Sequence, residues 1–220
     1  MVTNFSMKPR KEINDDETWM WKRNMNIGTW NVRSLFWSGA LKVLRNELSK
    51  LDFDIVALQE KCLGSGIQKF DNFTLFNRGS ECKKHEFGCR FYVRGEFLKH
   101  CKDFKIINER ICYLRLKAKW FSCTLINLHE PTNEKMEEVK EEFYNLLEQN
   151  RNQIANSDIK IILGDFNAKV GKEDIYKPTI SNESLHNETN NNGIKMIKFA
   201  VSKSFNVRST TYAQRDMVFS

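Results

Sequence analysis

One stretch of this 220-residue chain decides the fold: Ile159-Lys160-Ile161-Ile162-Leu163, followed at once by Gly164-Asp165-Phe166-Asn167. The apolar run predicts a buried strand, and Gly164 lets the backbone turn sharply where that strand ends. A carboxylate and a carboxamide then follow two positions apart, at the carboxyl end of a strand, where open α/β sheets bind their ligands. Taken alone, the stretch also fits an ordinary Gly-Asp turn with a local asparagine hydrogen bond.

The same pattern recurs elsewhere in the chain. Three other apolar, strand-like runs end in a polar side chain, and these side chains are Asn31, Glu60 and His129. If the four strands lie side by side, their polar residues gather along one edge: Asn31, Glu60, His129, Asp165 and Asn167. Carboxylates and amides together suit a hard divalent cation and a phosphate. The repeated pattern therefore predicts a phosphate-processing site at that edge.

Four motifs carry a resemblance to a known family. They are Ile27-Gly28-Thr29-Trp30-Asn31-Val32-Arg33-Ser34-Leu35, Ala57-Leu58-Gln59-Glu60, Asn127-Leu128-His129-Glu130-Pro131-Thr132 and Ile162-Leu163-Gly164-Asp165-Phe166-Asn167-Ala168-Lys169-Val170-Gly171. The chain resembles the endonuclease/exonuclease/phosphatase superfamily, and within it the retrotransposon-derived, craniofacial development protein 2-like subgroup. The later run Thr189-Asn190-Asn191-Asn192-Gly193 is similar to a further motif of that subgroup. The resemblance covers residues 25–212, nearly the whole chain.

The resemblance implies a role for each of the five polar residues. Glu60 is similar to the carboxylate that binds the catalytic Mg²⁺, and Asn31 is similar to an amide beside that metal and the scissile phosphate. Asp165 resembles the acid that orients or deprotonates the attacking water, and Asn167 resembles its phosphate-contacting neighbour. His129 stands where relatives carry a tyrosine or a histidine near the leaving side.

Two further charged residues flank these motifs. Arg33 follows the Asn31 corner and is a candidate clamp for a phosphate, although an ordinary exposed loop arginine would give the same sequence. Glu130 departs from the small residue that is usual after His129 in relatives. An extra negative charge at that position would disfavour a phosphate.

The fold implied by the resemblance is an α/β (α+β) four-layer sandwich, in which two mixed β-sheets pack face to face with helices outside. The implied reaction is hydrolysis of phosphodiester bonds in nucleic acid, DNA rather than RNA, with Mg²⁺ or Mn²⁺ as the cofactor. In such a reaction a metal neutralises charge on the phosphate and a carboxylate prepares water for in-line attack. Two alternatives stay open: a phosphatase of the same superfamily, and a non-catalytic remnant that only binds nucleic acid.

Relatives carry two late motifs, an Asn-x-Asp motif and then a terminal Ser-Asp-His motif, and neither is found after residue 193 of this sequence. We therefore expect a sandwich that is incomplete at its C-terminus and hydrolysis that is weak or absent. We also expect a monomer that aggregates readily through unpaired strand edges. The expected domain covers residues 24–220 and follows a flexible polar leader over residues 1–23.

The composition suits a globular domain with a polyanionic partner. The chain has 35 Lys and Arg against 28 Asp and Glu, with a net charge of +7 and a pI of about 9.1, which favours nucleic acid. A generic basic surface would give the same balance. The six cysteines lack Cys-x-x-Cys spacing, so we expect reduced thiols and no zinc site. Without a secretory signal or an apolar stretch of membrane length, we expect an intracellular protein, nuclear or cytoplasmic, that does not enter a membrane.

Apolar periodicity predicts most of the remaining elements. Helices are expected over residues 40–51, 133–151 and 193–203. Strands are expected over residues 73–76, 87–93 and 207–212. In the second helix, an inward-facing stripe is formed by Met136, Val139, Phe143 and Leu147. From Cys112 to Trp120, apolar and polar residues alternate, which predicts a half-buried antiparallel strand.

Overall fold

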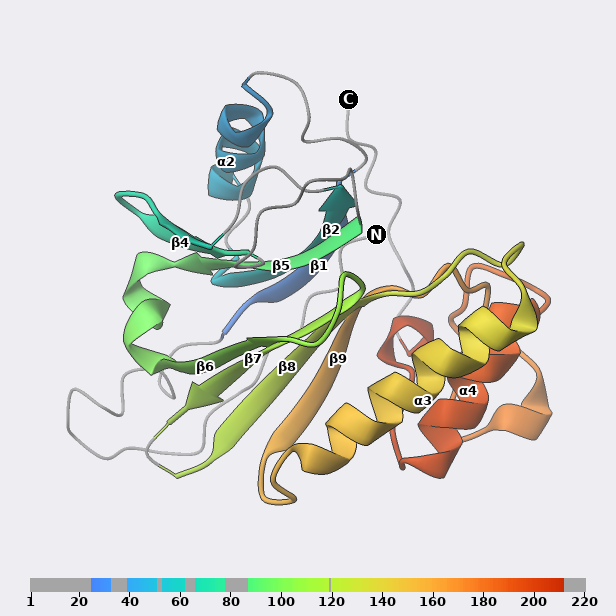
Figure 1. The fold of residues 1–220 in the computed structure, drawn as a ribbon. Coiled ribbons are helices and arrows are strands. Elements are labelled where there is room, and N and C mark those ends of the chain that lie inside the picture. Colours follow the sequence, from blue (N-terminus) through green and yellow to red (C-terminus); the bar gives the residue numbers. More distant parts are fainter. Residues whose placement is uncertain are drawn as a thin grey trace. The chain divides into compact units, whose positions relative to one another are not determined.

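The computed structural model describes residues 25–32, 39–50, 53–61, 66–77, 87–118 and 120–211 (Figure 1). The leader expected over residues 1–23 and the tail from residue 212 lie outside the described residues. The described residues divide into two compact units. The first unit extends to His129 and takes in Leu147–Asp165, and the second consists of Glu130–Leu146 and the residues from Phe166 onward. None of the helices in these ranges is both long and apolar enough to cross a bilayer.

The first unit contains two mixed β-sheets, and the first of these has the strand order β1-β2-β5-β4-β3. Its strands are β1 (Ile27–Asn31), β2 (Ile55–Lys61), β3 (Ile67–Lys69), β4 (Phe73–Phe76) and β5 (Phe87–Arg94). β1 and β2 run parallel, and the other neighbouring strands run antiparallel. The strands expected over residues 73–76 and 87–93 are confirmed.

The second sheet has the strand order β6-β7-β8-β9. Its strands are β6 (Cys101–Ile106), β7 (Ile111–Lys117), β8 (Ser122–His129) and β9 (Ile159–Asp165). β8 and β9 run parallel, and the other pairs run antiparallel. A 3₁₀ helix, η2 (Gly95–His100), leads directly from β5 into β6 and so joins the two sheets.

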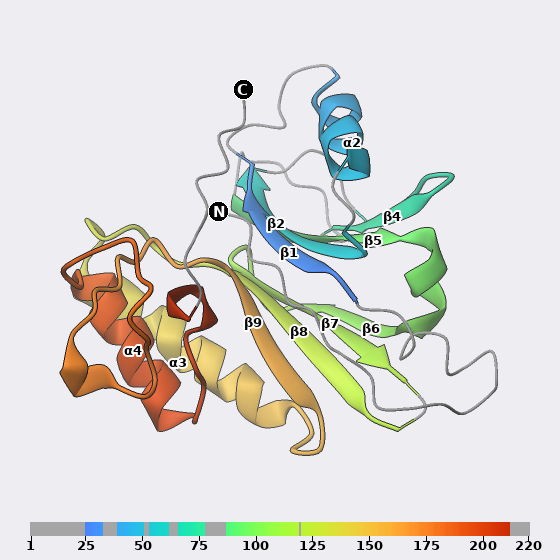
Figure 2. The same ribbon diagram turned by 180° about the vertical axis from the view of Figure 1, so that it is seen from behind.

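The two sheets pack face to face around one apolar core (Figure 2). β7 shows how the sequence pattern produces this packing, because Cys112, Leu114 and Leu116 point into the core and are buried, whereas Tyr113 and Arg115 alternate with them and are partly exposed. The prediction of two mixed sheets packed face to face is confirmed.

A polar bridge crosses the core between the two sheets. Asn127 on β8 is completely buried, and its Nδ2 donates hydrogen bonds to the carbonyl oxygens of Leu58 (3.0 Å) and Arg90 (2.7 Å) in the opposite sheet. Gln59 Nε2 donates to Asn127 Oδ1 at 2.6 Å. An unpaired buried amide costs about 1–3 kcal/mol, so these bonds favour a single alignment of β2 with β8. That alignment fixes the strand ends that carry Glu60 and His129.

Helix α2 (Ala40–Lys50) lies on the outer face of the first sheet, as the apolar spacing of its leucines predicts (Figure 1). Leu44 and Leu48 are buried against Val56, Leu58 and Tyr92. The helix predicted over residues 40–51 is therefore confirmed, and it lies outside the sandwich.

The second unit is built mainly from two helices. α3 (Glu137–Gln153) contributes its first part to this unit, and α4 (Asn191–Ser202) lies wholly within it. The rings of Tyr144 and Phe199 join the two helices, with centroids 5.7 Å apart. An apolar cluster consists of Val170, Ile180, Met196 and Ile197. The helix expected over residues 193–203 is confirmed, and it begins slightly earlier than expected because Asn190 caps its N-terminus.

The prediction that a helix begins at residue 133 is wrong. α3 begins at Glu137, and Met136, expected to face inward, precedes the helix and is 70% exposed. Asn133 lies before the helix, and its carbonyl oxygen accepts a hydrogen bond from the Lys140 side chain (Nζ) at 2.8 Å. Phe143 and Leu147 are buried as expected, whereas Val139 is only half-buried.

Two strand predictions also need correction. The described part of the segment 207–212 is not a strand, because Arg208–Thr210 forms a 3₁₀ helix in which Thr210 Oγ1 bonds to the Val207 carbonyl oxygen at 2.7 Å. The alternating strand that starts near Cys112 ends at Lys117. Trp120 follows in the turn to β8 and is 72% exposed, so it fills no core position.

Candidate active site

Asn31 and Asp165 meet at the ends of two strands from different sheets. Asn31 is the last residue of β1, and Asp165 is the last residue of β9. The Asn31 Nδ2 donates a hydrogen bond to Asp165 Oδ2 at 2.5 Å, which is short for an amide and a carboxylate. Each strand runs parallel to a neighbour, β1 beside β2 and β9 beside β8. The carboxyl ends of β1 and β9 therefore bring these two polar side chains into contact.

His129 lies next to Asp165, since the two residues are partners in the parallel register of β8 and β9. Its backbone is held by Arg110, whose carbonyl oxygen accepts the His129 N–H at 2.9 Å and whose Nη1 donates to the His129 carbonyl oxygen at 3.2 Å. The imidazole is buried, and burial is the main cause that lowers the pKa of His129 below its usual 6.5. Asp165 opposes this lowering of the pKa, and Arg110 adds to it. The imidazole is consequently neutral at pH 7.

The lowered pKa of His129 predicts how stability depends on pH. Below about pH 6.5 the unfolded chain protonates this imidazole, whereas the folded chain does so only at lower pH. The unfolded state then binds more protons, so the free energy of unfolding falls as the pH drops through this window. We expect urea unfolding to show lower stability at about pH 5.5 than at about pH 7.5. His129→Gln should show a smaller difference between the two pH values than the unmodified chain.

His186→Gln serves as the matched control, because His186 lies in a loop of the other compact unit. This variant should keep the full pH difference of the unmodified chain. Equal pH differences in the unmodified chain and in His129→Gln would contradict the assignment of the effect to His129.

The remaining predicted site residues are placed less fully. Glu60 belongs to β2, one position after Gln59, which is the register partner of Asn31; its side chain is outside the described part of the structure, and so is Arg33. Asn167 belongs to the second unit and has a left-handed backbone, with φ of 45°. Its Nδ2 donates to the carbonyl oxygen of Glu130 at 2.7 Å. The structure thus brings Asn31, His129 and Asp165 together and places the backbone of Glu60 beside them.

The side chain of Glu130 is fully buried in the second unit. It lies against the hydroxyl of Tyr144, whose pKa is raised mainly by burial and further by Glu130. The Glu130 side chain, whose charge was predicted to disfavour a phosphate, is therefore directed into the interior of this unit.

The sequence of the chain matches the model of the endonuclease/exonuclease/phosphatase family over residues 28–216. The chain belongs to this family. The resemblance inferred from the four motifs is therefore confirmed.

Two curated relatives cover most of the chain. Craniofacial development protein 2 of Bos taurus is 28% identical over 194 residues, which make up 88% of this chain and 32% of that protein. Craniofacial development protein 2 of Tragulus javanicus is 28% identical over 210 residues, or 94% of this chain and 36% of that protein. The chain thus spans about a third of the length of these relatives.

Two solved structures share the fold of this family member. The AP endonuclease LMAP from Leishmania major matches with a TM-score of 0.52 and 16% identity, covering 92% of this chain and 71% of that one. The endonuclease domain of TRAS1, a telomere-specific non-LTR retrotransposon, matches with a TM-score of 0.50 and 12% identity, covering 79% of this chain and 70% of that one. At such identities the likeness concerns the fold alone.

Sequence reasoning missed residues that support the site in this family member. Arg110 forms hydrogen bonds with the backbone of His129. The sequence feature that could have pointed to Arg110 is its position as a basic residue directly before the alternating strand that starts at Ile111. Gln59 and Asn127 form the bridge between the sheets. Their signal was a polar residue inside an otherwise apolar run, which is costly unless the side chain finds partners.

The oxygen donors at this edge fit a hard divalent cation. The Asp165 carboxylate and the Asn31 amide both offer oxygen atoms, which Mg²⁺ prefers. Among the described side chains, no three His, Cys, Asp or Glu residues gather as a metal cluster would require. Because Mg²⁺ keeps several waters and needs only one or two carboxylates, the fit depends on Glu60 as the additional ligand.

Proposed function

We propose that this chain is a hydrolase of phosphodiester bonds in nucleic acid, with DNA preferred over RNA and with Mg²⁺ or Mn²⁺ as its cofactor. The observation that carries the proposal is the hydrogen bond between Asn31 and Asp165, with His129 as the register partner of Asp165. This arrangement combines a carboxylate of fixed orientation with a neutral imidazole. Membership of the family and the net charge of +7 support a polyanionic phosphodiester as the substrate.

In the proposed hydrolysis, each polar side chain of the site has a separate role. Asp165 holds the attacking water and takes its proton, and the Asn31 amide keeps the accepting carboxylate in one orientation. His129 is neutral, so its N–H can donate a hydrogen bond toward the oxygen of the leaving group without adding a charge. Asn167 and Arg33 would contact the phosphate, because an amide N–H and a guanidinium are suitable donors to its oxygens.

Glu60 and Asn31 would hold the divalent cation. When bound, the cation neutralises charge that develops on the phosphate. The backbone of Glu60 lies near the carboxyl end of β2, beside the strand that ends at Asn31, and this position supports the proposed role. A DNA substrate would place the action of the protein inside the cell, in the nucleus or the cytoplasm.

Conversion of supercoiled plasmid to the nicked form tests this proposal. We expect weak nicking with Mg²⁺ or Mn²⁺ and none in excess EDTA, because the cation would neutralise charge on the phosphate. A soluble aryl phosphomonoester, assayed in parallel, distinguishes the phosphatase alternative. Hydrolysis of the phosphomonoester with intact plasmid would contradict the proposal. Retention of plasmid on a gel without any metal-dependent nicking would favour a protein that only binds nucleic acid.

A further inference from the structure

Asn190 does more than cap helix α4. Its Oδ1 accepts the backbone N–H of Gly193 at 2.8 Å, which is the usual capping bond. The same oxygen also accepts the N–H of Lys169 at 3.0 Å, and the N–H of Asn190 donates to the carbonyl oxygen of Lys169 at 3.1 Å. A helix cap needs only the first of these bonds. The other two hold the backbone just after Asn167.

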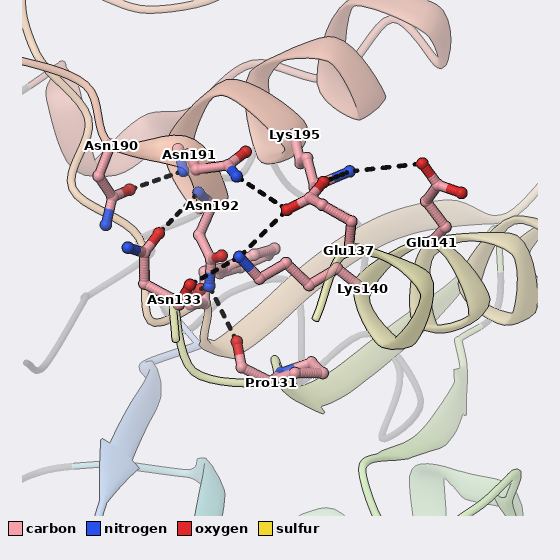
Figure 3. A network of polar contacts seen from close by, with 11 residues as sticks. Pro131, Asn133, Glu137, Lys140, Glu141, Asn190, Asn191, Asn192 and Lys195 are labelled. Atoms are coloured by element: carbon pink, nitrogen blue, oxygen red, sulfur yellow. Dashed lines mark hydrogen bonds and ion pairs between the residues drawn. The ribbon is translucent and has the colours of Figure 1, made fainter. Parts of the chain in front are cut away.

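Asn192 contacts the same region from within α4. Its side chain is completely buried, and its Nδ2 donates to the carbonyl oxygens of Pro131 (2.9 Å) and Phe166 (3.4 Å). Pro131 follows Glu130, and Phe166 precedes Asn167. One amide thus joins two loops, which follow β8 and β9 in the chain. Figure 3 shows its bond to Pro131.

Asn167 lies between these anchoring points. Phe166 on one side is held by Asn192, and Lys169 on the other side is held by Asn190. The left-handed φ of 45° at Asn167 is uncommon for a residue with a side chain, although asparagine adopts it more readily than most. Its Nδ2 bond to the Glu130 carbonyl oxygen also needs the 130–133 loop to stay in place. The surrounding bonds therefore stabilise a conformation that the isolated loop would not prefer.

Helix α3 binds the 130–133 loop at Asn133, whereas Asn192 of α4 binds it at Pro131 (Figure 3). Lys140 is only 1% exposed, and its Nζ donates to the Asn133 carbonyl oxygen at 2.8 Å. A buried ammonium group needs such partners, and Glu137 is a second one at 3.4 Å. Glu137 also binds Lys195 of α4 at 2.7 Å. The two helices are therefore linked to each other and to the loop.

Close packing at the start of α4 adds to this arrangement. A Cβ atom at Gly193 would lie 2.1 Å from the Lys169 carbonyl oxygen, so only glycine allows the helix to approach the loop this closely. The run from Asn190 to Gly193 is thus shaped to fit the segment that contains Asn167.

We propose that Asn190 and Asn192 are positioning residues, which hold the Phe166–Lys169 segment so that Asn167 presents its side chain in one orientation for the proposed phosphodiester hydrolysis. The inference rests on the proposed function for its catalytic consequence. The geometric part concerns only contacts within the second unit, and it can be tested without hydrolysis.

Three consecutive asparagines provide a matched set of variants. Asn190→Ala removes both acceptor bonds, and Asn190→Asp keeps an oxygen in the same place. Asn191→Ala is the control, because the Asn191 side chain is exposed and bonds to Glu137 at 2.8 Å rather than to either loop. Asn192→Ala is a second test variant, which removes the side-chain hydrogen bonds to the carbonyl oxygens of Pro131 and Phe166.

Amide hydrogen exchange followed by NMR gives the first readout. In Asn190→Ala we expect the Lys169 and Gly193 amide protons to exchange roughly fivefold to tenfold faster, as suits the loss of one hydrogen bond each, and we expect the Asn167 side-chain amide signals to shift. Asn190→Asp should restore both, and Asn191→Ala should change neither. Unchanged Lys169 exchange in Asn190→Ala, or an equal effect in Asn191→Ala, would overturn the proposal.

Kinetics of plasmid nicking give the second readout. We expect kcat to fall about tenfold or more in Asn190→Ala with little change in KM, since small displacements of a catalytic group cost up to about 10²-fold, and we expect Asn190→Asp to recover most of it. A normal kcat in Asn190→Ala would also overturn the proposal. If the unmodified chain shows no metal-dependent nicking, the proposed function fails, and the exchange comparison still decides whether the asparagines hold Asn167.

Discussion

Asp165→Asn should lower the rate of metal-dependent plasmid nicking by about 10²-fold or more, the usual effect of losing a general base. The substitution keeps the shape of the side chain but removes the group that can take a proton from water. It also replaces the carboxylate that accepts the Asn31 amide at 2.5 Å with a second amide. Initial rates of nicking, measured at saturating Mg²⁺, check this expectation.

Asp103→Asn is the matched control for this experiment. Asp103 is exposed on β6 and lies on the same compact unit, so the same chemical change there should leave the nicking rate within about twofold. Asn31→Ala should give an intermediate loss, because it leaves the Asp165 carboxylate in place but without its orienting partner. Full nicking activity in Asp165→Asn would show that another residue prepares the water.

Gly164→Ala should lower the free energy of unfolding by about 4 kcal/mol or more, a size of effect that is exceptional for a single substitution. Gly164 has φ of +138°, which side chains rarely allow. A Cβ atom would also lie 2.0 Å from the Leu128 carbonyl oxygen and 2.9 Å from its nitrogen. Because Leu128 and Gly164 are register partners, the added methyl group would separate β8 from β9 just before His129 and Asp165.

Gly66→Ala is the control that distinguishes the cost of backbone strain from the cost of steric overlap at Gly164. Gly66 also has a positive φ, of +83°, but a Cβ atom there would meet nothing within 4 Å. We expect this control to cost only about 1–2 kcal/mol, the price of a left-handed conformation. Urea denaturation of both variants gives the comparison. Equal losses of stability would mean that the close approach to Leu128 is relaxed in solution.

The carboxyl ends of the strands were predictable from the sequence because one local pattern produced each of them. The apolar run before Gly164 predicted a buried strand, and Asp165 lies at the end of that strand as expected. The same reasoning placed Asn31 and His129 correctly at strand ends. Parallel pairing of β8 with β9 places His129 beside Asp165. The contact between Asn31 and Asp165 depends instead on how the two sheets pack, which spacing along the chain did not contain.

The parts that could not be predicted depend on contacts distant in sequence. From the sequence alone, Asn127 is a polar residue in an otherwise apolar strand, with no visible partner. Its partners are the carbonyl oxygens of Leu58 and Arg90, which only the folded structure brings near it. Val207 begins an apparent strand, yet the Thr210 side chain turns the backbone into a 3₁₀ helix. Local side-chain hydrogen bonds of this kind compete with strand pairing and leave little trace in apolar periodicity.

We propose that nucleic acid binds this protein where Asn31, His129 and Asp165 come together. NMR of the ¹⁵N-labelled chain, titrated with a short DNA duplex in metal-free buffer so that the DNA stays intact, tests this claim most directly. We predict that the largest chemical-shift changes occur at the Asn31 side-chain amide, the His129 imidazole and the backbone of Gly164 and Asp165. Changes confined to the exposed faces of β6 and β7, with these signals unmoved, would contradict the account.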